Sequence, residues 1–90
     1  MNFTVEQNRI FALNESGDTI AEVTFPDLSR EKVEINRTFV DESLRGQGIA
    51  GMLMKAAYIE IKRQGKKALP TCSFAVKWFE THPECTDIIA

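Results

Sequence analysis

The stretch LRGQGIAG, Leu44 to Gly51, is the most informative part of this sequence. Its last six letters, GQGIAG, match the pattern G-x-G-x-x-G, which is typical of loops that hold the pyrophosphate of a nicotinamide dinucleotide. Read one residue earlier, the same letters give R-G-x-G-x-A, which implies a different cofactor and a different fold. The residues on either side decide which phosphate-bearing ligand, if any, the loop is built to hold.

The flanking residues do not suit a dinucleotide-binding fold. That fold needs a strand that runs almost directly into the first glycine and an acidic residue about 20 positions later. Here a five-residue connection, Asp41 to Arg45, precedes Gly46, and the later position falls on the Pro-Thr-Cys of residues 70–72. A Walker-type loop is even less favoured, because no Gly-Lys-Ser or Gly-Lys-Thr follows.

The loop can still bind a phosphate through its backbone. A series of N–H groups at a helix N-terminus, where the helix dipole is positive, is a natural anion site. Gly46 and Gly48 remove side chains that would keep a phosphate away, Ala50 is small, and Arg45 can add a charge-assisted contact. The simpler alternative is a glycine-rich turn that joins a strand to a helix and binds nothing, and the loop alone leaves both open.

Composition is typical of a small globular protein. The 90 residues are 43% hydrophobic and 27% charged, so we expect one domain, residues 1–90, with a packed core. A formal net charge of −2 provides no positive field for a nucleic acid. No apolar run approaches the roughly 20 residues that span a bilayer, and the start does not resemble a signal peptide. We therefore expect a cytoplasmic protein with neither a nucleic acid nor a membrane as partner.

The two cysteines, Cys72 and Cys85, are too few for a disulfide framework. With His82 as the only histidine, they make a poor zinc site unless carboxylates join them. We expect free thiols and no bound metal.

Hydrophobic patterning predicts an α/β (α+β) fold with a mostly antiparallel sheet of about five strands. The predicted elements are strands near 3–5, 10–12, 19–25 and 33–40, a helix at 48–64, a strand at 67–71 and a short helix at 73–80. Alternation places Ala21, Val23 and Phe25 on one face of the third strand. The same rule predicts one shared face in the fourth strand for Val33, Ile35, Arg37 and Phe39.

The long helix is predicted to lie across the sheet and to end at Gly65. Its apolar residues at helical spacing are Ile49, Met52, Leu53 and Ala56, with a second set at Met54, Ala57, Tyr58 and Ile61. Together they leave only a narrow polar edge for solvent.

The longer string VDESLRGQGIAGMLM, Val40 to Met54, resembles the acetyl-coenzyme A motif of the GNAT superfamily of N-acetyltransferases. In that family a strand ending in Val precedes Arg/Gln-x-x-Gly-x-Gly/Ala, matched here by Arg45, Gly48 and Ala50. The order of strands and helices also agrees, so the resemblance covers nearly the whole chain. It implies that acetyl-CoA is the co-substrate.

The resemblance also implies the site residues for that co-substrate. The amides of Gly46, Gln47, Gly48, Ile49 and Ala50 would bind the pyrophosphate, with Arg45 beside them. The backbone of Phe39 and Val40 would pair with the pantetheine arm like an added strand.

The chain departs from typical members of that family and is similar to a minimal, short subgroup. It has no helical segment after the first strand, where larger members form one wall of the acceptor groove. The subgroup features are the stretch Thr71-Cys72-Ser73-Phe74, the end His82-Pro83-Glu84, and Asp87. Phe79 stands near the place of the usual general-acid Tyr and cannot donate a proton to a leaving thiolate.

Cys72 is the candidate catalytic residue. Pro70 should end the strand and Ser73 should cap the next helix, which puts Cys72 at a helix N-terminus where the dipole favours a thiolate. In the family arrangement this strand end lies beside the thioester, so the sulfur could accept the acetyl group and pass it to an amine. The alternative is that Cys72 only lines the pocket while the amine attacks directly.

The aromatic residues of the last helix, Phe74, Trp78 and Phe79, are expected to anchor the core. His82 is interpreted as a helix-end residue and Cys85 as a filler.

The predicted function is transfer of an acetyl group from acetyl-CoA to a primary amine, either a protein lysine or a small polyamine. One alternative is a non-catalytic acetyl-CoA-binding or interaction module that needs a partner chain to supply the acceptor site. The other is a structural domain whose loop binds nothing.

Overall fold

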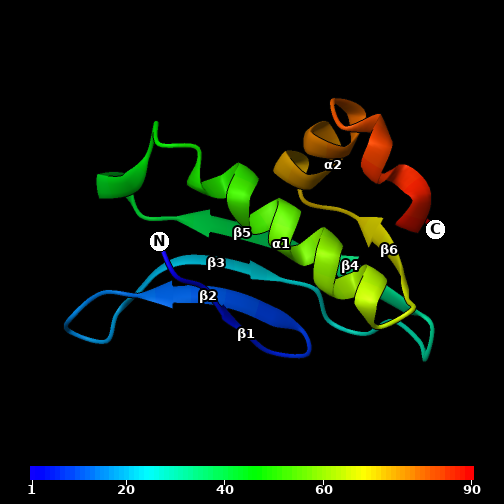
Figure 1. Ribbon diagram of the computed structural model, residues 1–90, viewed down its shortest axis with the longest axis horizontal. Helices are drawn as coiled ribbons and strands as arrows, with labels where there is room; N and C mark the ends of the chain where they lie inside the picture. Colours follow the sequence, from blue (N-terminus) through cyan, green and yellow to red (C-terminus); the bar gives the residue numbers. More distant parts are fainter.

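The computed structural model describes residues 1–90 and contains a sheet covered on one face by helices (Figure 1). The strands are β1 (Thr4–Val5), β2 (Arg9–Leu13), β3 (Thr19–Thr24), β4 (Lys32–Ile35), β5 (Arg37–Val40) and β6 (Lys67–Pro70). The helices are α1 (Ile49–Arg63) and α2 (Ser73–Glu80), with short 3₁₀ helices η1 (Glu42–Leu44) and η2 (Pro83–Ile88). The expected mixed fold with an antiparallel sheet is confirmed, and the bounds of α2 are those predicted.

Four antiparallel strands in the order β1-β2-β3-β5 form the main sheet, and β4 pairs in parallel with β6. The predicted strand at 33–40 is thus two strands that meet at Asn36. There Asn36 bonds Thr24 through both its backbone N–H, at 3.3 Å, and its side chain, at 2.6 Å. β6 pairs with β4 and not with β5, so β5 and β6 separate beyond Asn36.

The break at Asn36 changes the direction of the side chains that follow it. Val33 and Ile35 are fully buried, whereas Arg37 is exposed and pairs with Thr24 in the register of β3. The prediction that Val33, Ile35, Arg37 and Phe39 share a face is therefore wrong. One extra residue at a bend shifts a strand's two-residue alternation to the opposite face.

The face of the main sheet opposite α1 is covered by its own side chains. Arg9 lies 3.7 Å from the centre of the Phe11 ring, and Arg37 lies 5.4 Å from that of Phe39. The carboxylate of Glu22, between them, forms ion pairs with both arginines. These cation–π and ionic contacts shield two aromatic rings on a face that has no helix of its own.

Helix α1 lies across the other face, as Figure 1 shows, and its buried side packs on β2, β3 and β5. Leu53, Ala57 and Ile61 are fully buried, and Gly65, at φ +73°, lies just beyond the helix end. Met52 is 45% exposed, contrary to prediction, because the buried stripe is centred about one residue further along the helix. Exposed Lys55 and Lys62 share this outer edge.

A single cluster of 19 buried residues forms the core between the sheet and the helices. Trp78 and Phe79 belong to it, at 7% and 4% exposure, and confirm the expected anchors, while Phe74 is 38% exposed and does not. Cys85 is fully buried in η2, in agreement with its interpretation as a filler. No helix in the structure is both long and apolar enough to cross a membrane.

Candidate functional site

The loop from Arg45 to Gly48 needs glycine at two positions for its backbone shape. Gly46 and Gly48 have φ values of +83° and +75°, in the left-handed region that side chains disfavour. A Cβ at either position would meet nothing within 4 Å, so the space in front of the loop is open. The segment before it is ordered by Asp41, whose pKa is lowered by hydrogen bonds from Ser43.

The backbone amides of this loop and of the first turn of α1 are free. From Gly46 to Gly51, none donates to an acceptor in the protein, and Gly48 caps the helix without a side-chain bond. The positive end of the α1 dipole lies at the same place. This arrangement suits an anion such as a phosphate or pyrophosphate, which needs several converging donors.

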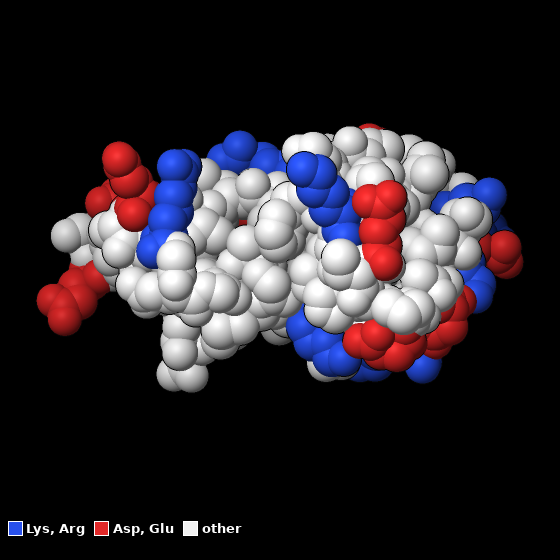
Figure 2. All heavy atoms as spheres, turned by 90° about the horizontal axis from the view of Figure 1, so that it is seen from above, with Lys and Arg blue, Asp and Glu red and all other residues white.

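A pocket of about 300 Å³ lies against this loop. Its lining combines the predicted loop residues with apolar side chains, namely Val40, Leu44, Arg45, Gly46, Gly48, Ile49, Ala50, Gly51 and Phe74. Phe74 was predicted to be a core anchor, yet it is the one member contributed by α2. Seen from above, the middle of the molecule presents mainly uncharged side chains, with both basic and acidic ones on either side (Figure 2). A loop of free amides therefore adjoins a partly apolar wall.

Cys72 lies at the N-terminus of α2, as predicted, but it is itself the N-cap. Its Sγ accepts a hydrogen bond from the amide of Ala75 at 3.4 Å, so Ser73 is the first helical residue and not the cap. The Sγ also lies 3.5 Å from the Thr38 hydroxyl on β5. The cysteine is only partly buried, and it bridges β5 and the start of α2 where the two parts of the sheet diverge.

Glu34 was missed by the sequence interpretation. Its carboxylate accepts a hydrogen bond of 2.6 Å from the Thr71 hydroxyl, and it forms no ion pair. The amides of Thr71 and Cys72 both bond the carbonyl of Ile35, the residue after Glu34, at 3.0 and 3.2 Å. The half-buried Glu34 thus directly precedes Ile35, the residue whose carbonyl bonds the Cys72 amide. No local motif marks it, since the parallel pairing of β4 with β6 creates this proximity.

A second hollow, of about 530 Å³, lies between α1 and α2 and shares Gly48 and Gly51 with the first. Lys55 and Trp78 also line it. The ring of His82 stacks on Trp78 at 4.0 Å, and its Nδ1 lies 2.7 Å from the Trp78 carbonyl oxygen. His82 therefore closes the end of α2, as interpreted from the sequence.

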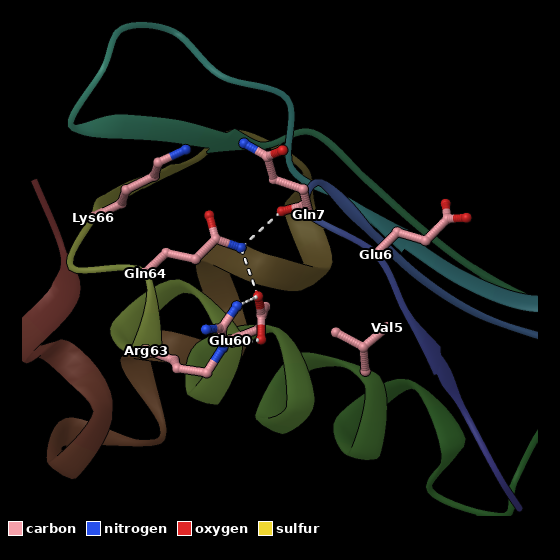
Figure 3. A pocket seen from close by; sticks show the side chains of 7 residues that line it. All are labelled: Val5, Glu6, Gln7, Glu60, Arg63, Gln64 and Lys66. Atoms are coloured by element: carbon pink, nitrogen blue, oxygen red, sulfur yellow. Dashed lines mark hydrogen bonds and ion pairs between the residues drawn. The ribbon is translucent and has the colours of Figure 1, made fainter.

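A third hollow, of about 520 Å³, lies at the other end of α1 and shares no residue with the loop. Figure 3 shows Gln64 bridging the Gln7 carbonyl and the Glu60 carboxylate, with Arg63 beside Glu60. The hydrogen bonds from Arg63 lower the pKa of Glu60 to about 2, against the effect of burial and with help from Gln64. The buried carboxylate is satisfied by its own helix, so this hollow is a structural junction.

The segment after α2 packs on α1 through a polar cluster. Tyr58 donates to Asp87 at 2.8 Å, and Lys62 forms an ion pair with the same carboxylate at 2.8 Å. The Nζ of Lys55 lies 3.9 Å from the Sγ of Cys85, and burial raises the pKa of that thiol. No group of three or more His, Cys, Asp or Glu side chains is arranged to hold a metal ion.

Comparison with known proteins agrees with this geometry. A family model of GCN5-related N-acetyl-transferases matches residues 9–88. A comparison with curated protein sequences gives no significant match.

Several solved structures share the fold. A GCN5-like protein from Staphylococcus aureus, proposed to be an N-acetyltransferase, has a TM-score of 0.80 and 24% identity, over 99% of this chain and 87% of that one. An acetyltransferase from Bacillus cereus has a TM-score of 0.65 and 26% identity, over 82% and 54% of the two chains. A GNAT family acetyltransferase from Elizabethkingia anophelis, solved with acetyl-CoA bound, has a TM-score of 0.62 and 20% identity, over 84% and 50%. The chain spans about half the length of these last two proteins.

Proposed function

The chain belongs to the family of GCN5-related N-acetyl-transferases, and we propose that it transfers an acetyl group from acetyl-CoA to a primary amine. The observation that carries this proposal is the run of free amides from Gly46 to Gly51, next to an apolar pocket and in front of a helix N-terminus. Backbone donors of this kind fit the pyrophosphate of acetyl-CoA, and the apolar lining fits the less polar arm that follows it.

The pantetheine arm would then run along the free edge of β5. This strand pairs with β3 on one edge only, and the amide of Asp41 bonds the Ile20 carbonyl on that edge. Because neighbouring residues of a strand direct their backbone groups to opposite edges, Val40 presents its own groups to the gap beside β6. The backbone of Val40 would thus bind the arm as an added strand, whereas by the same alternation the backbone of Phe39 faces β3.

The nucleotide end would lie in the hollow between α1 and α2. That hollow shares Gly48 and Gly51 with the loop pocket, and Lys55 and Trp78 also line it. A negatively charged, flat nucleotide suits such a lining.

At the opposite end, the thioester would lie beside Cys72. We propose that the Cys72 thiolate attacks the thioester carbonyl, so that a new C–S bond forms and the thiolate of CoA leaves. The amine then attacks acetyl-Cys72, and the cysteine thiolate departs while the amine loses a proton. We propose that Glu34, whose carboxylate accepts a hydrogen bond from the Thr71 hydroxyl next to Cys72, receives that proton. In the competing route the amine attacks the bound thioester directly.

One observation favours a second candidate function, a non-catalytic acetyl-CoA-binding module. The sheet face opposite α1 is covered only by Arg9, Arg37 and their aromatic neighbours, and no segment of the chain walls off an acceptor groove there. A partner chain could complete the groove.

Titration with acetyl-CoA, followed by incubation with a panel of amines and detection of released thiol, separates these functions. We expect saturable binding and thiol release that depends on an amine. Binding without release, with or without any amine in the panel, would favour the module. Absence of binding would contradict both functions.

A further inference from the structure

The outer surface of β4 and β5, on the side away from α1, carries an alternating row of charges. Lys32 and Glu34 point to the same side of β4, because Val33 and Ile35 between and after them are fully buried. After the bend at Asn36, the side chain of Arg37 lies on this side too, where it contacts Glu22. Along the strand the row reads positive, negative, positive.

The charges in this row are available for a ligand. Neither Lys32 nor Glu34 takes part in an ion pair, and the only partner of Glu34 is the Thr71 hydroxyl. Arg37 uses its Nε for Glu22 at 3.3 Å, and its side chain remains 55% exposed. Arg9, the other partner of Glu22, makes the neighbouring surface more positive than negative.

We call Lys32, Glu34 and Arg37 the acceptor row. We infer that this row binds a peptide lysine that has acidic residues on both sides, an inference that rests on the proposed acetyl transfer. The ammonium group of the lysine would lie at Glu34, whose carboxylate bonds the hydroxyl of Thr71, the residue before Cys72. Carboxylates within two residues of the lysine would lie at Lys32 and Arg37, since residues two apart in an extended peptide are roughly 7 Å apart.

The same row disfavours the other class of acceptor. A polyamine that placed one ammonium group at Glu34 would bring its further cations toward Lys32, Arg37 and Arg9. Like charges at such positions oppose binding, whereas carboxylates there favour it. The surface thus selects the protein lysine over the small polyamine.

The test compares two end-blocked peptides, Glu-Ala-Lys-Ala-Glu and Gln-Ala-Lys-Ala-Gln, with spermidine. Binding of the fluorescein-labelled peptides is measured by anisotropy, and turnover by thiol release. At low salt we expect the glutamate peptide to bind roughly fivefold more tightly than the glutamine peptide. This preference should shrink in 0.5 M NaCl, which screens exposed charges at about 4–5 Å.

Charge reversal of the row decides whether the preference arises there. In the double variant Lys32→Glu and Arg37→Glu, spermidine should become the preferred ligand. Arg37→Gln, which keeps the aliphatic stem over Phe39, should weaken only the glutamate peptide. Lys77→Glu, a charge reversal at a single exposed position of α2, should leave the order unchanged. The KM for acetyl-CoA should stay constant in each variant that turns over.

Equal binding of the two peptides, or tighter binding of spermidine by the wild type, would overturn the inference. A preference that survives both row variants would overturn it as well. Charge-dependent binding without thiol release would contradict the proposed enzymatic function and leave the acceptor row supported. Thiol release without charge preference would support the proposed enzymatic function and overturn the inference about the acceptor row.

Discussion

The sulfur of Cys72 lies 3.5 Å from the hydroxyl oxygen of Thr38, across the gap where β5 and β6 separate. The two residues are 34 positions apart in the sequence, and their contact joins the edge of the main sheet to the start of α2. It also places a partly buried thiol within reach of a group bound along β5.

Replacing Cys72 with Ala should abolish acetyl transfer while acetyl-CoA still binds, because the loop amides and the pocket wall remain. Incubation of the wild type with acetyl-CoA alone should leave a hydroxylamine-sensitive acetyl group on Cys72, detected by mass spectrometry of peptides. Cys85 is the internal control, since it is fully buried and should stay unmodified. Turnover of Cys72→Ala at the wild-type rate would show that the amine attacks the thioester directly.

Gly48→Val should weaken acetyl-CoA binding by about tenfold or more, because a side chain would enter the phosphate path and disturb the free amides. Gly17 provides a matched control in the turn between β2 and β3. Both glycines have positive φ, +75° and +86°, and open space around a built Cβ. Each Val variant should lose about 1–2 kcal/mol of folding stability. Equal affinities in the two variants, measured by calorimetry, would remove the loop from the site.

Arg45→Ala should cost about 1–2 kcal/mol of acetyl-CoA binding at low salt, because a charge-assisted contact to phosphate is lost while the backbone cradle remains. The difference from wild type should shrink in 0.5 M NaCl. Arg30→Ala, in the exposed loop between β3 and β4, should bind like the wild type. A loss that does not change with salt would argue against direct contact between Arg45 and the phosphate.

Phe74→Ala should lower acetyl-CoA affinity by about three- to tenfold, since the ring lines the pocket. Its effect on stability should stay below about 1 kcal/mol, because the ring is 38% exposed. Phe79→Ala, on the same helix but at 4% exposure, should instead lose about 3–5 kcal/mol of stability. Urea unfolding and ligand titration of the two variants test this division, and a large stability loss in Phe74→Ala would contradict it.

Glu60 should make folding stability dependent on pH in acid. Its pKa is lowered from 4.5 to about 2 in the folded protein, so its contribution is present above pH 4.5 and is lost as the pH falls toward 2. We expect about 1–2 kcal/mol from this group, because Arg63 is 69% exposed and solvent screens the pair. Urea unfolding at pH 7, 4.5 and 3 should show a smaller acid loss in Glu60→Gln than in wild type. An equal loss of unfolding free energy with falling pH in the two proteins would contradict this role of Glu60.

Local chemistry was sufficient to predict several parts of the molecule. The alternation that buries Ala21, Val23 and Phe25, the start of α2 at Ser73 and the end of α1 near Gly65 each depend on neighbouring residues. The glycines of the loop can be assigned for the same reason, because a left-handed backbone is allowed to few other residues.

Tertiary structure alone decided the break at Asn36, the exposure of Phe74 and the position of Glu34 beside Thr71. Alternation gives a strand's period but not its partners, and residues 32–40 change partners from β6 to β3 in mid-course. Phe74 and Phe79 satisfy the same helical pattern, and only the packing of α2 on α1 and η2 determines which ring is covered. The sequence by itself thus determined the family, the places of the two α-helices and the glycines of the loop. Long-range pairing decided which side chains meet at the site, because contacts between distant residues leave no periodic signal.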